Sequence, residues 1–294
     1  MRLGALEAGG TKMVCAIGNE NGEILDRVVF PTEDPQETMP RLLSWFAGQK
    51  PDALGIASFG PLNLDRTSGQ YGDITTTPKL AWKFFPLLRT FRETLGIPCS
   101  IDTDVNAAAL AELRLGAARG LASCLYVTVG TGIGGGLVLE NRLVHGLVHP
   151  EFGHILLRPD KDDPLPRGVC PYHDGCLEGL CSGPSLLARY GVPAEELPPD
   201  HPAWERESAY LAQMCVNAIM TLSVEKIILG GGVMQQGHLF PRIREKTRDL
   251  LGGYIHHQMV EEKMEDYIVP PALGTHSGIT GALLIGSEAL SEAR

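Results

Sequence analysis

Short apolar runs separated by glycine-rich turns fill the first thirty residues of the chain. The runs "LGALEA", "MVCAIG" and "EILDRVVF" each fit a strand, and the turn signals "GGTK" and "NENGE" lie between them. Connections this short join antiparallel neighbours. The pattern therefore predicts an antiparallel meander at the start of the chain.

Apolar runs alternate with helical patterns over the next ninety or so residues. "PDALGIASFG" predicts a strand that ends in a glycine–proline turn, and "IPCSIDTD" predicts a buried strand. "FFPLLRTFRETLG" predicts a helix closed by Gly96, and "VNAAALAELRLGAARG" predicts a second one rich in strong helix formers. Asp104 stands between the second strand and the second helix, in the position expected of an N-cap.

The opening pattern then restarts. "SCLYVTVGTGIGGGLVLENRLVHG" predicts strand, turn, strand, turn and strand, and its Gly/Thr turn "VGTGIGG" matches the earlier "EAGGTK". Helices near 184–190, 204–222 and 239–251, a strand in "EKIILGGG" and a last helix from "HSGITGALLIG" follow, with a Pro-rich surface loop at "PAEELPPDHPA". A repeated meander with helices predicts an α/β protein of two similar lobes.

Composition narrows the classes of partner and compartment. The 294 residues are 44% hydrophobic and carry a formal net charge of −10, which argues against nucleic acid or an anionic membrane as partner. We find neither a signal-peptide pattern at the N-terminus nor an apolar run long enough to cross a bilayer. Seven cysteines without the spacing of a secreted module indicate reduced thiols and a cytoplasmic protein.

The glycine turns fit several kinds of structure or binding site. "GTGIGG" has the form G-x-G-x-x-G, but the following residues alternate like a strand rather than opening a helix, which disfavours a dinucleotide site, and no P-loop pattern occurs. Each turn alone fits a tight hairpin. A glycine turn also exposes backbone N–H donors to an anion. Two such turns and the cluster "LGGGV" suggest a nucleotide, with the turns on its phosphates and the third cluster on its nucleoside.

The stretch "CPYHDGC" brings Cys170, His173 and Cys176 together. It fits a metal site, a disulfide or a loop of free thiols. A reducing compartment disfavours the disulfide. Two thiolates and an imidazole favour Zn²⁺ over hard cations, and a closed tetrahedral site needs a fourth ligand.

Taken together, these motifs resemble those of the ROK family of sugar kinases, within the actin-like ATPase fold. The resemblance is carried by "EAGGTK", "DTDVN", "VGTGIGGGLVLENRLVHGLVHPEFGH", "CPYHDGCLEG" and "LGGGV", in the family's order along nearly the whole chain. "LEAGGTK", "TTTPK", "DTDVN" and the histidine inside the cysteine cluster are most similar to the fructokinase branch. The resemblance implies an ATP- and Mg²⁺-dependent transfer of phosphate to the 6-hydroxyl of D-fructose, by a homodimer.

The resemblance also implies the domain organisation. The resemblance implies an α/β, ribonuclease H-like fold, with a mixed sheet in each lobe and a cleft between the lobes. We expect a smaller N-terminal lobe over 1–116, completed by a C-terminal helix at 276–294. The larger lobe is expected over 117–275 and contains the zinc-binding segment 154–176.

Phosphoryl transfer to a hydroxyl needs a base, donors and Mg²⁺ for the polyphosphate, and exclusion of water. Asp104 matches the family's catalytic aspartate, and Asp102 is expected to be structural. Thr103 departs from the asparagine of many members and offers a hydroxyl in place of an amide. Glu7 departs from the usual aspartate, so it either reaches Mg²⁺ through water or orders the turn. The implied nucleotide-binding residues are Gly9, Gly10, Thr11, Lys12, Thr131, Gly132, Gly230, Gly231 and Gly232.

Carboxylates and imidazoles suit a sugar because a polyol offers directional donors and acceptors. Lys79 in "TTTPK" is either a further ligand or plain surface charge. The resemblance supplies His154 as the fourth zinc ligand, which closes the site and makes the zinc structural, and Cys181 is left outside the set. The implied sugar-binding residues are Gly60, Thr103, Glu151, His154 and Glu178.

Other functions stay open on the sequence. Another ROK hexose kinase would act on glucose, mannose or an amino sugar. A ROK transcriptional repressor would need an N-terminal helix-turn-helix, whereas here the first strand is expected from Leu3. A non-catalytic sugar sensor would bind sugar without consuming ATP.

Overall fold

The computed structural model describes residues 1–293 and divides into two compact units. The first unit comprises Met1–Gly116, Arg142–Pro150 and the described part of Thr275–Arg294. The second comprises Ala117–Asn141 and Glu151–Gly274. The segment Arg142–Pro150, which the sequence places in the larger lobe, thus groups with the first unit.

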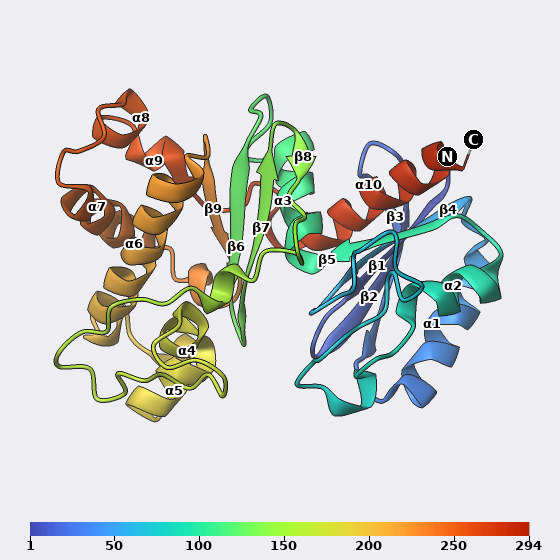
Figure 1. Ribbon diagram of the computed structural model, residues 1–294, viewed down its shortest axis with the longest axis horizontal. Coiled ribbons are helices and arrows are strands. Elements are labelled where there is room, and N and C mark those ends of the chain that lie inside the picture. The colour runs from blue at the N-terminus through green and yellow to red at the C-terminus, as the bar shows by residue number, and fades with distance from the viewer. Residues whose placement is uncertain (294) are drawn as a thin grey trace. The chain divides into compact units, whose positions relative to one another are not determined.

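A five-stranded mixed sheet forms the centre of the first unit (Figure 1). Its order is β3-β2-β1-β4-β5. The first three strands pair antiparallel, which confirms the predicted meander, and β1, β4 and β5 run parallel. The strands are β1 Leu3–Ala8, β2 Lys12–Gly18, β3 Ile24–Pro31, β4 Ala53–Ser58 and β5 Cys99–Thr103.

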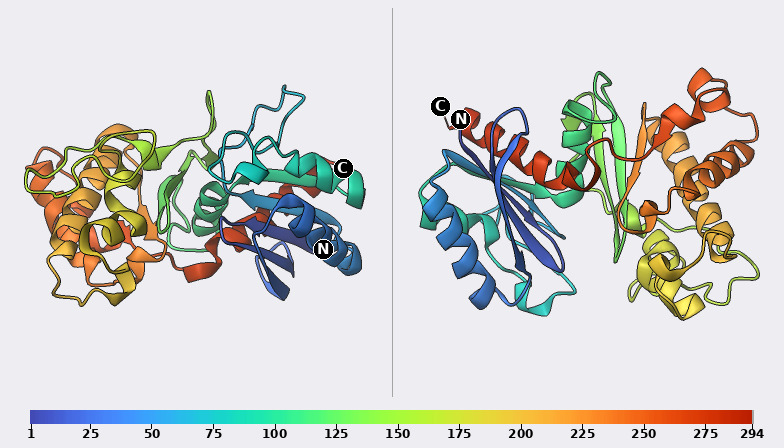
Figure 2. Two further views of the ribbon diagram at one scale, coloured as in Figure 1. Left: turned by 90° about the horizontal axis from the view of Figure 1, so that it is seen from below. Right: turned by 180° about the vertical axis from the view of Figure 1, so that it is seen from behind.

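Helices cover both faces of this sheet (Figure 2). Alternate residues of β1 enter two cores: Leu6 packs with residues of α1 and α2, and Leu3 with residues of α3 and α10. Gly96 adopts the left-handed conformation and ends α2, as predicted. The helices are α1 Pro35–Gln49, α2 Leu87–Leu95, α3 Asp104–Arg114 and α10 Ser277–Glu292, with a 3₁₀ turn η1 at Leu80–Trp82.

The C-terminal helix α10 approaches its neighbours closely through glycine. A Cβ atom on Gly55 of β4 would lie 1.9 Å from the carbonyl oxygen of Ala282, and one on Gly281 would lie 1.9 Å from that of Ala107 in α3. Both distances are far below van der Waals contact, so only glycine fits. The last helix is therefore an integral part of the first unit's core.

The second unit repeats the arrangement. Its sheet has the order β10-β9-β6-β7-β8, and the edge strand β8 is the start of the segment Arg142–Pro150 that groups with the first unit. Counted from β8, this order matches that of the first sheet counted from β3. β6 and β7 pair antiparallel, and β6, β9 and β10 run parallel. The predicted duplication is confirmed. The strands are β6 Cys124–Val129, β7 Ile133–Leu139, β8 Arg142–Leu143, β9 Ile227–Gly230 and β10 Ile268–Val269.

Two long helices, α6 and α7, pack against each other in the second unit (Figure 1). Within residues 1–293, none of the helices combines the length and apolar character that crossing a bilayer requires. The α-helices are α4 Leu177–Cys181, α5 Gly183–Tyr190, α6 Ala203–Leu222, α7 Leu239–Leu251, α8 Gln258–Glu261 and α9 Met264–Tyr267. The 3₁₀ turns are η2 Phe152–His154, η3 Ala194–Glu196, η4 Val233–Gln235 and η5 Gly274–His276.

Candidate active site and metal centre

The first glycine turn joins β1 and β2. Gly9 N–H donates to the carbonyl of Lys12 at 3.0 Å, while Thr32 holds the outer carbonyls: its hydroxyl donates to Gly9 O at 2.8 Å and its N–H to Thr11 O at 3.0 Å. Among the described residues, the N–H groups of Gly10 and Thr11 have no hydrogen-bond partner. The turn is thus held firmly and leaves two adjacent donors for an anion.

Lys79 lies against this turn. A Cβ atom on Gly10 would be 3.4 Å from Cε of Lys79, so the lysine side chain passes directly over the glycine. Its backbone precedes η1, whose buried Trp82 donates from Nε1 to Glu33 O at 2.8 Å and so anchors the loop. The loop therefore brings a second cation to the turn beside Lys12.

Glu7 lies near the end of β1, close to the turn. Its carboxylate reaches the first turn of α10, where a Cβ atom on Gly278 would lie 2.7 Å from Oε1. Burial raises the pKa of Glu7, and the charges of Lys12 and Arg27 oppose that rise. The carboxylate thus lies at the start of α10 and within the electrostatic influence of Lys12, which is compatible with either predicted role.

The second glycine turn joins β6 and β7 and is held differently. Gly130 O accepts from the N–H of Gly183 at 2.8 Å, and the Glu178 carboxylate accepts from the N–H of Ile133 at 2.9 Å. A Cβ atom on Gly132 would lie 2.8 Å from Glu178 Oε2. The structure therefore joins a predicted phosphate turn to a predicted sugar ligand of the same unit.

The third glycine cluster follows β9. A Cβ atom on Gly230 would lie 2.6 Å from the hydroxyl oxygen of Tyr126, and Gly231 has φ +90° with its α-carbon against the backbone of Val129. Gly232 has open space on its side-chain face. The close approach to β6 explains the first two glycines, while the third leaves room for a ligand.

Asp104 is the first residue of α3 and is half-buried. The expected N-cap position belongs instead to Thr103, whose buried hydroxyl accepts from the N–H of Asn106 at 3.1 Å. The chain leaves β5 at Thr103, one residue earlier than the cap expected at Asp104, so Asp104 occupies the first helical turn. There the helix dipole favours its negative charge.

Asp102 is buried and accepts three hydrogen bonds. Its Oδ1 accepts from Thr103 N–H at 2.8 Å and from Asn106 Nδ2 at 2.7 Å, and Oδ2 lies 2.7 Å from Nε2 of His145. Sequence reasoning did not single out His145 or His149, whose Nε2 accepts from Leu62 N–H at 3.0 Å. The only signal for them was their place inside the run "HGLVHPEFGH".

The predicted sugar ligands are divided between the units. Gly60 lies in the first unit, beside His149: a Cβ atom on Gly60 would be 3.3 Å from Cε1 of that ring. Glu151, His154 and Glu178 belong to the second unit. Desolvation raises the pKa of Glu151, and the neighbouring Glu178 carboxylate raises it further. The second unit therefore brings two predicted sugar carboxylates close together.

His154, Cys170, His173 and Cys176 form one cluster, with their ligand atoms all within 4.8 Å of one another. Nδ1 of His154 lies 3.9 Å from Sγ of Cys170 and 3.8 Å from Sγ of Cys176. Tetrahedral Zn²⁺ bonded at about 2.0 Å to nitrogen and 2.3 Å to sulfur would separate such atoms by roughly 3.6 Å. The donor set and spacing therefore fit zinc, and Cys181 lies buried in α4 outside the cluster.

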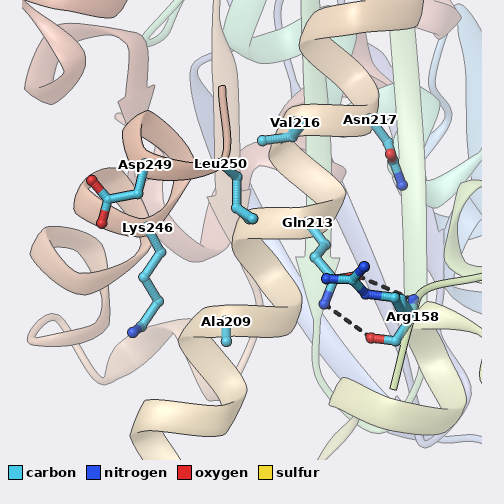
Figure 3. A pocket seen from close by; sticks show the side chains of 8 residues that line it. All are labelled: Arg158, Ala209, Gln213, Val216, Asn217, Lys246, Asp249 and Leu250. Carbon is cyan, nitrogen blue, oxygen red and sulfur yellow. Dashed lines mark hydrogen bonds between the residues drawn. The ribbon is translucent and has the colours of Figure 1, made fainter. Parts of the chain in front are cut away.

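The loop between His154 and Cys170 is also tied to α6. Gln213 accepts from Arg158 N–H and donates to Arg158 O, both at 3.1 Å, as Figure 3 shows. Tyr210, one turn earlier, donates to Asp163 Oδ2 at 2.6 Å. Arg158 also lines a pocket of about 540 Å³ beside α6 and α7 (Figure 3). None of the predicted site residues lines that pocket, so it lies outside the candidate active site.

Comparison with known proteins supports these motifs. The sequence pattern of the ROK family matches residues 3–289. A fructokinase of Pediococcus pentosaceus is 45% identical over 295 residues, which cover 100% of both chains. A glucokinase of Halalkalibacterium halodurans is 29% identical over 272 residues, covering 79% of this chain and 80% of that one.

The fold comparison agrees. The crystal structure of a ROK hexokinase from Thermus thermophilus matches with a TM-score of 0.77 and 29% sequence identity, covering 99% of this chain and 100% of that one. The family pattern, the relatives and the duplicated sheets thus point the same way. The chain belongs to the ROK family and has the actin-like fold of its sugar kinases.

Proposed function

We propose that this protein is an ATP- and Mg²⁺-dependent fructokinase that transfers the γ-phosphate of ATP to the 6-hydroxyl of D-fructose. The observation that carries the proposal is the position of Asp104 on the first turn of α3, behind a strand end held by buried hydrogen bonds. The full-length similarity to a fructokinase favours fructose over glucose, because the glucokinase relative is more distant. The resemblance to the family also supports a cytoplasmic homodimer.

Asp104 acts as general base in this proposal. It accepts the proton of the 6-hydroxyl as the oxygen attacks the γ-phosphorus, which makes the attacking oxygen more nucleophilic. The dipole of α3 favours the charged form that this role requires. Thr103, whose hydroxyl already caps the helix, keeps its own O–H for a second acceptor such as a sugar oxygen.

The glycine turns bind the nucleotide. The free N–H groups of Gly10 and Thr11 suit phosphate oxygens, with Lys12 and Lys79 supplying positive charge, and Thr131 with Gly132 does the same from the second unit. Mg²⁺ would neutralise the polyphosphate, and Glu7, two residues before the first turn, is the candidate carboxylate for holding it. Gly230, Gly231 and Gly232 leave room for the nucleoside.

Zinc has a structural role in the proposal. His154, Cys170, His173 and Cys176 fill four positions, so no ligand position is left for a substrate. The ion would hold the segment of Glu151 and His154 against α4, which carries Glu178. These three side chains and Gly60 then bind the sugar hydroxyls. Because a buried polar ligand left unpaired is costly, they can distinguish one hexose from another.

An ADP-release assay across a panel of hexoses, with Asp104→Asn beside the wild type, tests this proposal. We expect fructose to give the highest kcat/KM, with the product phosphorylated at O6 by phosphorus NMR. Asp104→Asn should lower kcat by about 10²- to 10⁴-fold. The exposed Asp249→Asn in α7 is the matched control and should stay within twofold of wild type, a margin of about 0.4 kcal/mol. If glucose were turned over as well as fructose, the fructose assignment would be wrong. If Asp104→Asn kept the wild-type kcat, Asp104 would not be the general base.

A further inference from the structure

The segment Arg142–Pro150 is fastened to the first unit at three points. Leu143 packs against the core that α3 and α10 share. His145 Nε2 lies 2.7 Å from Asp102 Oδ2, and the buried His149 accepts the N–H of Leu62 at 3.0 Å. Between the histidines, Leu147 and Val148 are exposed. Hydrogen bonds that involve two imidazole rings, rather than apolar packing, therefore fix the second half of the segment.

Asp102 connects His145 to the start of α3 through hydrogen bonds. One carboxylate oxygen meets the imidazole, and the other accepts from Thr103 N–H and from the side chain of Asn106. Thr103 caps α3 and Asn106 is its third residue, so the two groups that Asp102 holds lie on either side of Asp104. A rotation of the Asp102 carboxylate would therefore displace the backbone that carries Asp104.

We propose that His145 is a positioning residue for the general base. By holding Asp102 in the rotamer that accepts from Thr103 and Asn106, it sets the direction in which Asp104 meets the sugar hydroxyl. This inference rests on the proposed function of Asp104. In this proposal His145, on a partly exposed segment, acts through the buried Asp102 on the backbone that carries Asp104.

The charges around His145 give the contact a pH dependence. Its hydrogen bond to Asp102 is the main cause of a raised pKa, which Arg66 and desolvation oppose. His149 faces it from the same segment, and Glu288 of α10 faces Asp102. Because the pKa is raised, the ion pair is present below the ordinary range of histidine and is lost as the pH rises through the raised value. Above it, an uncharged N–H donor remains.

Three substitutions separate these contributions. Gln places its amide nitrogen near the position of Nε2, so His145→Gln keeps a neutral donor to Asp102, whereas the shorter Asn in His145→Asn does not reach. We expect His145→Asn and His145→Ala to lower kcat by about 10- to 100-fold. His145→Gln should retain most of kcat but lose the alkaline limb that the wild type shows. Added imidazole should restore activity to His145→Ala alone, because the half-exposed site admits it.

The control is His256→Ala, which removes an exposed histidine that pairs with Glu261 at 2.8 Å in the second unit. Its kcat should stay at the wild-type level. If His145→Asn and His145→Ala kept a wild-type kcat, or if imidazole restored nothing, the positioning role would be overturned. A role in stability alone would lower the unfolding temperature without a difference between Gln and Asn in kcat.

A second measurement does not depend on activity. Histidine NMR should show the pKa of His145 falling in Asp102→Asn, and an unchanged value would overturn the ion pair. If the wild type phosphorylated no hexose while this shift was present, the proposed function would fail and the contact would stand. If the wild type were active and the shift absent, only the positioning inference would fail.

Discussion

The two glycine turns occupy equivalent places in duplicated sheets, yet the side chains that contact them carry opposite charges. The turn between β1 and β2 is braced by the neutral Thr32 and lies beneath the Lys79 side chain. The turn between β6 and β7 is braced by the Glu178 carboxylate. Both keep the backbone in a shape that exposes N–H donors.

This difference indicates that the two turns have different binding roles. The Lys79 cation over the first turn favours an anion there. A carboxylate bonded to the second turn repels phosphate unless the turn's own donors outweigh it, but it can accept from sugar hydroxyls. We infer that the first turn serves only the nucleotide, while the second couples nucleotide binding to the sugar ligands of its own unit. Three predictions test this difference.

The largest effect is expected from Cys176→Ser in the second unit. It removes one of four ligands, so zinc content should fall from about one ion per chain and KM for fructose should rise by about 10- to 100-fold. ATP binding should change less than sugar binding, because the first turn and its lysines keep their contacts. Metal analysis and titration calorimetry check both points. The buried Cys181→Ala, outside the cluster, is the control and should keep its zinc. Loss of ATP affinity with sugar affinity intact would contradict these different roles.

A matched pair of glycine substitutions compares the turns directly. Gly132→Ala puts a Cβ atom 2.8 Å from Glu178 Oε2, so the carboxylate must move and its bond to Ile133 is lost. We expect KM for fructose to rise about tenfold, the equivalent of one such hydrogen bond. In Gly10→Ala the nearest atom is the flexible Lys79 Cε at 3.4 Å, an ordinary contact, so sugar affinity should hold. Equal losses of sugar affinity in both variants would show that the turns do not differ in this way.

The smallest effect is expected from Lys79→Met. It removes a half-exposed charge from the first turn, which should raise KM for ATP about fivefold, as for a loss of about 1 kcal/mol. KM for fructose should be unaffected, and the difference should shrink as salt screens the charge. Lys83→Met, in the same loop and over the Phe84 ring, is the control. A wild-type KM for ATP in Lys79→Met would show that Lys79 is a surface charge with no role in ATP binding.

Local patterns were enough to predict most of the fold. Apolar runs and glycine turns located the two meanders. Gly96 marked the end of α2 because glycine adopts the left-handed conformation of a helix C-terminus without a steric penalty. The placement of Arg142–Pro150 was not predictable in this way. It depends on Leu143 and two histidines meeting residues far away in the chain, and no local period records such contacts.

The candidate site was predictable in its residue types but not in its connections. The four metal-ligating residues meet, although the fourth, His154, came only from family resemblance. The bond between Glu178 and the second turn spans 45 positions, and Lys79 lies over Gly10 by way of the anchored Trp82. Thr103 and Asp104 are both good caps, and which of them caps α3 depends on where β5 ends.

The glycine contacts of α10 have a consequence for how the protein is made. The ribosome synthesises the chain from its N-terminus, so this helix emerges after the other described elements of both units. Until then one face of the first unit's sheet lacks the cover of α10, which Gly55 of β4 is shaped to receive. The second unit, whose residues end at Gly274, is complete earlier. The half of the protein that is translated first is therefore expected to finish folding last, and its exposed apolar face is the one that a chaperone would meet.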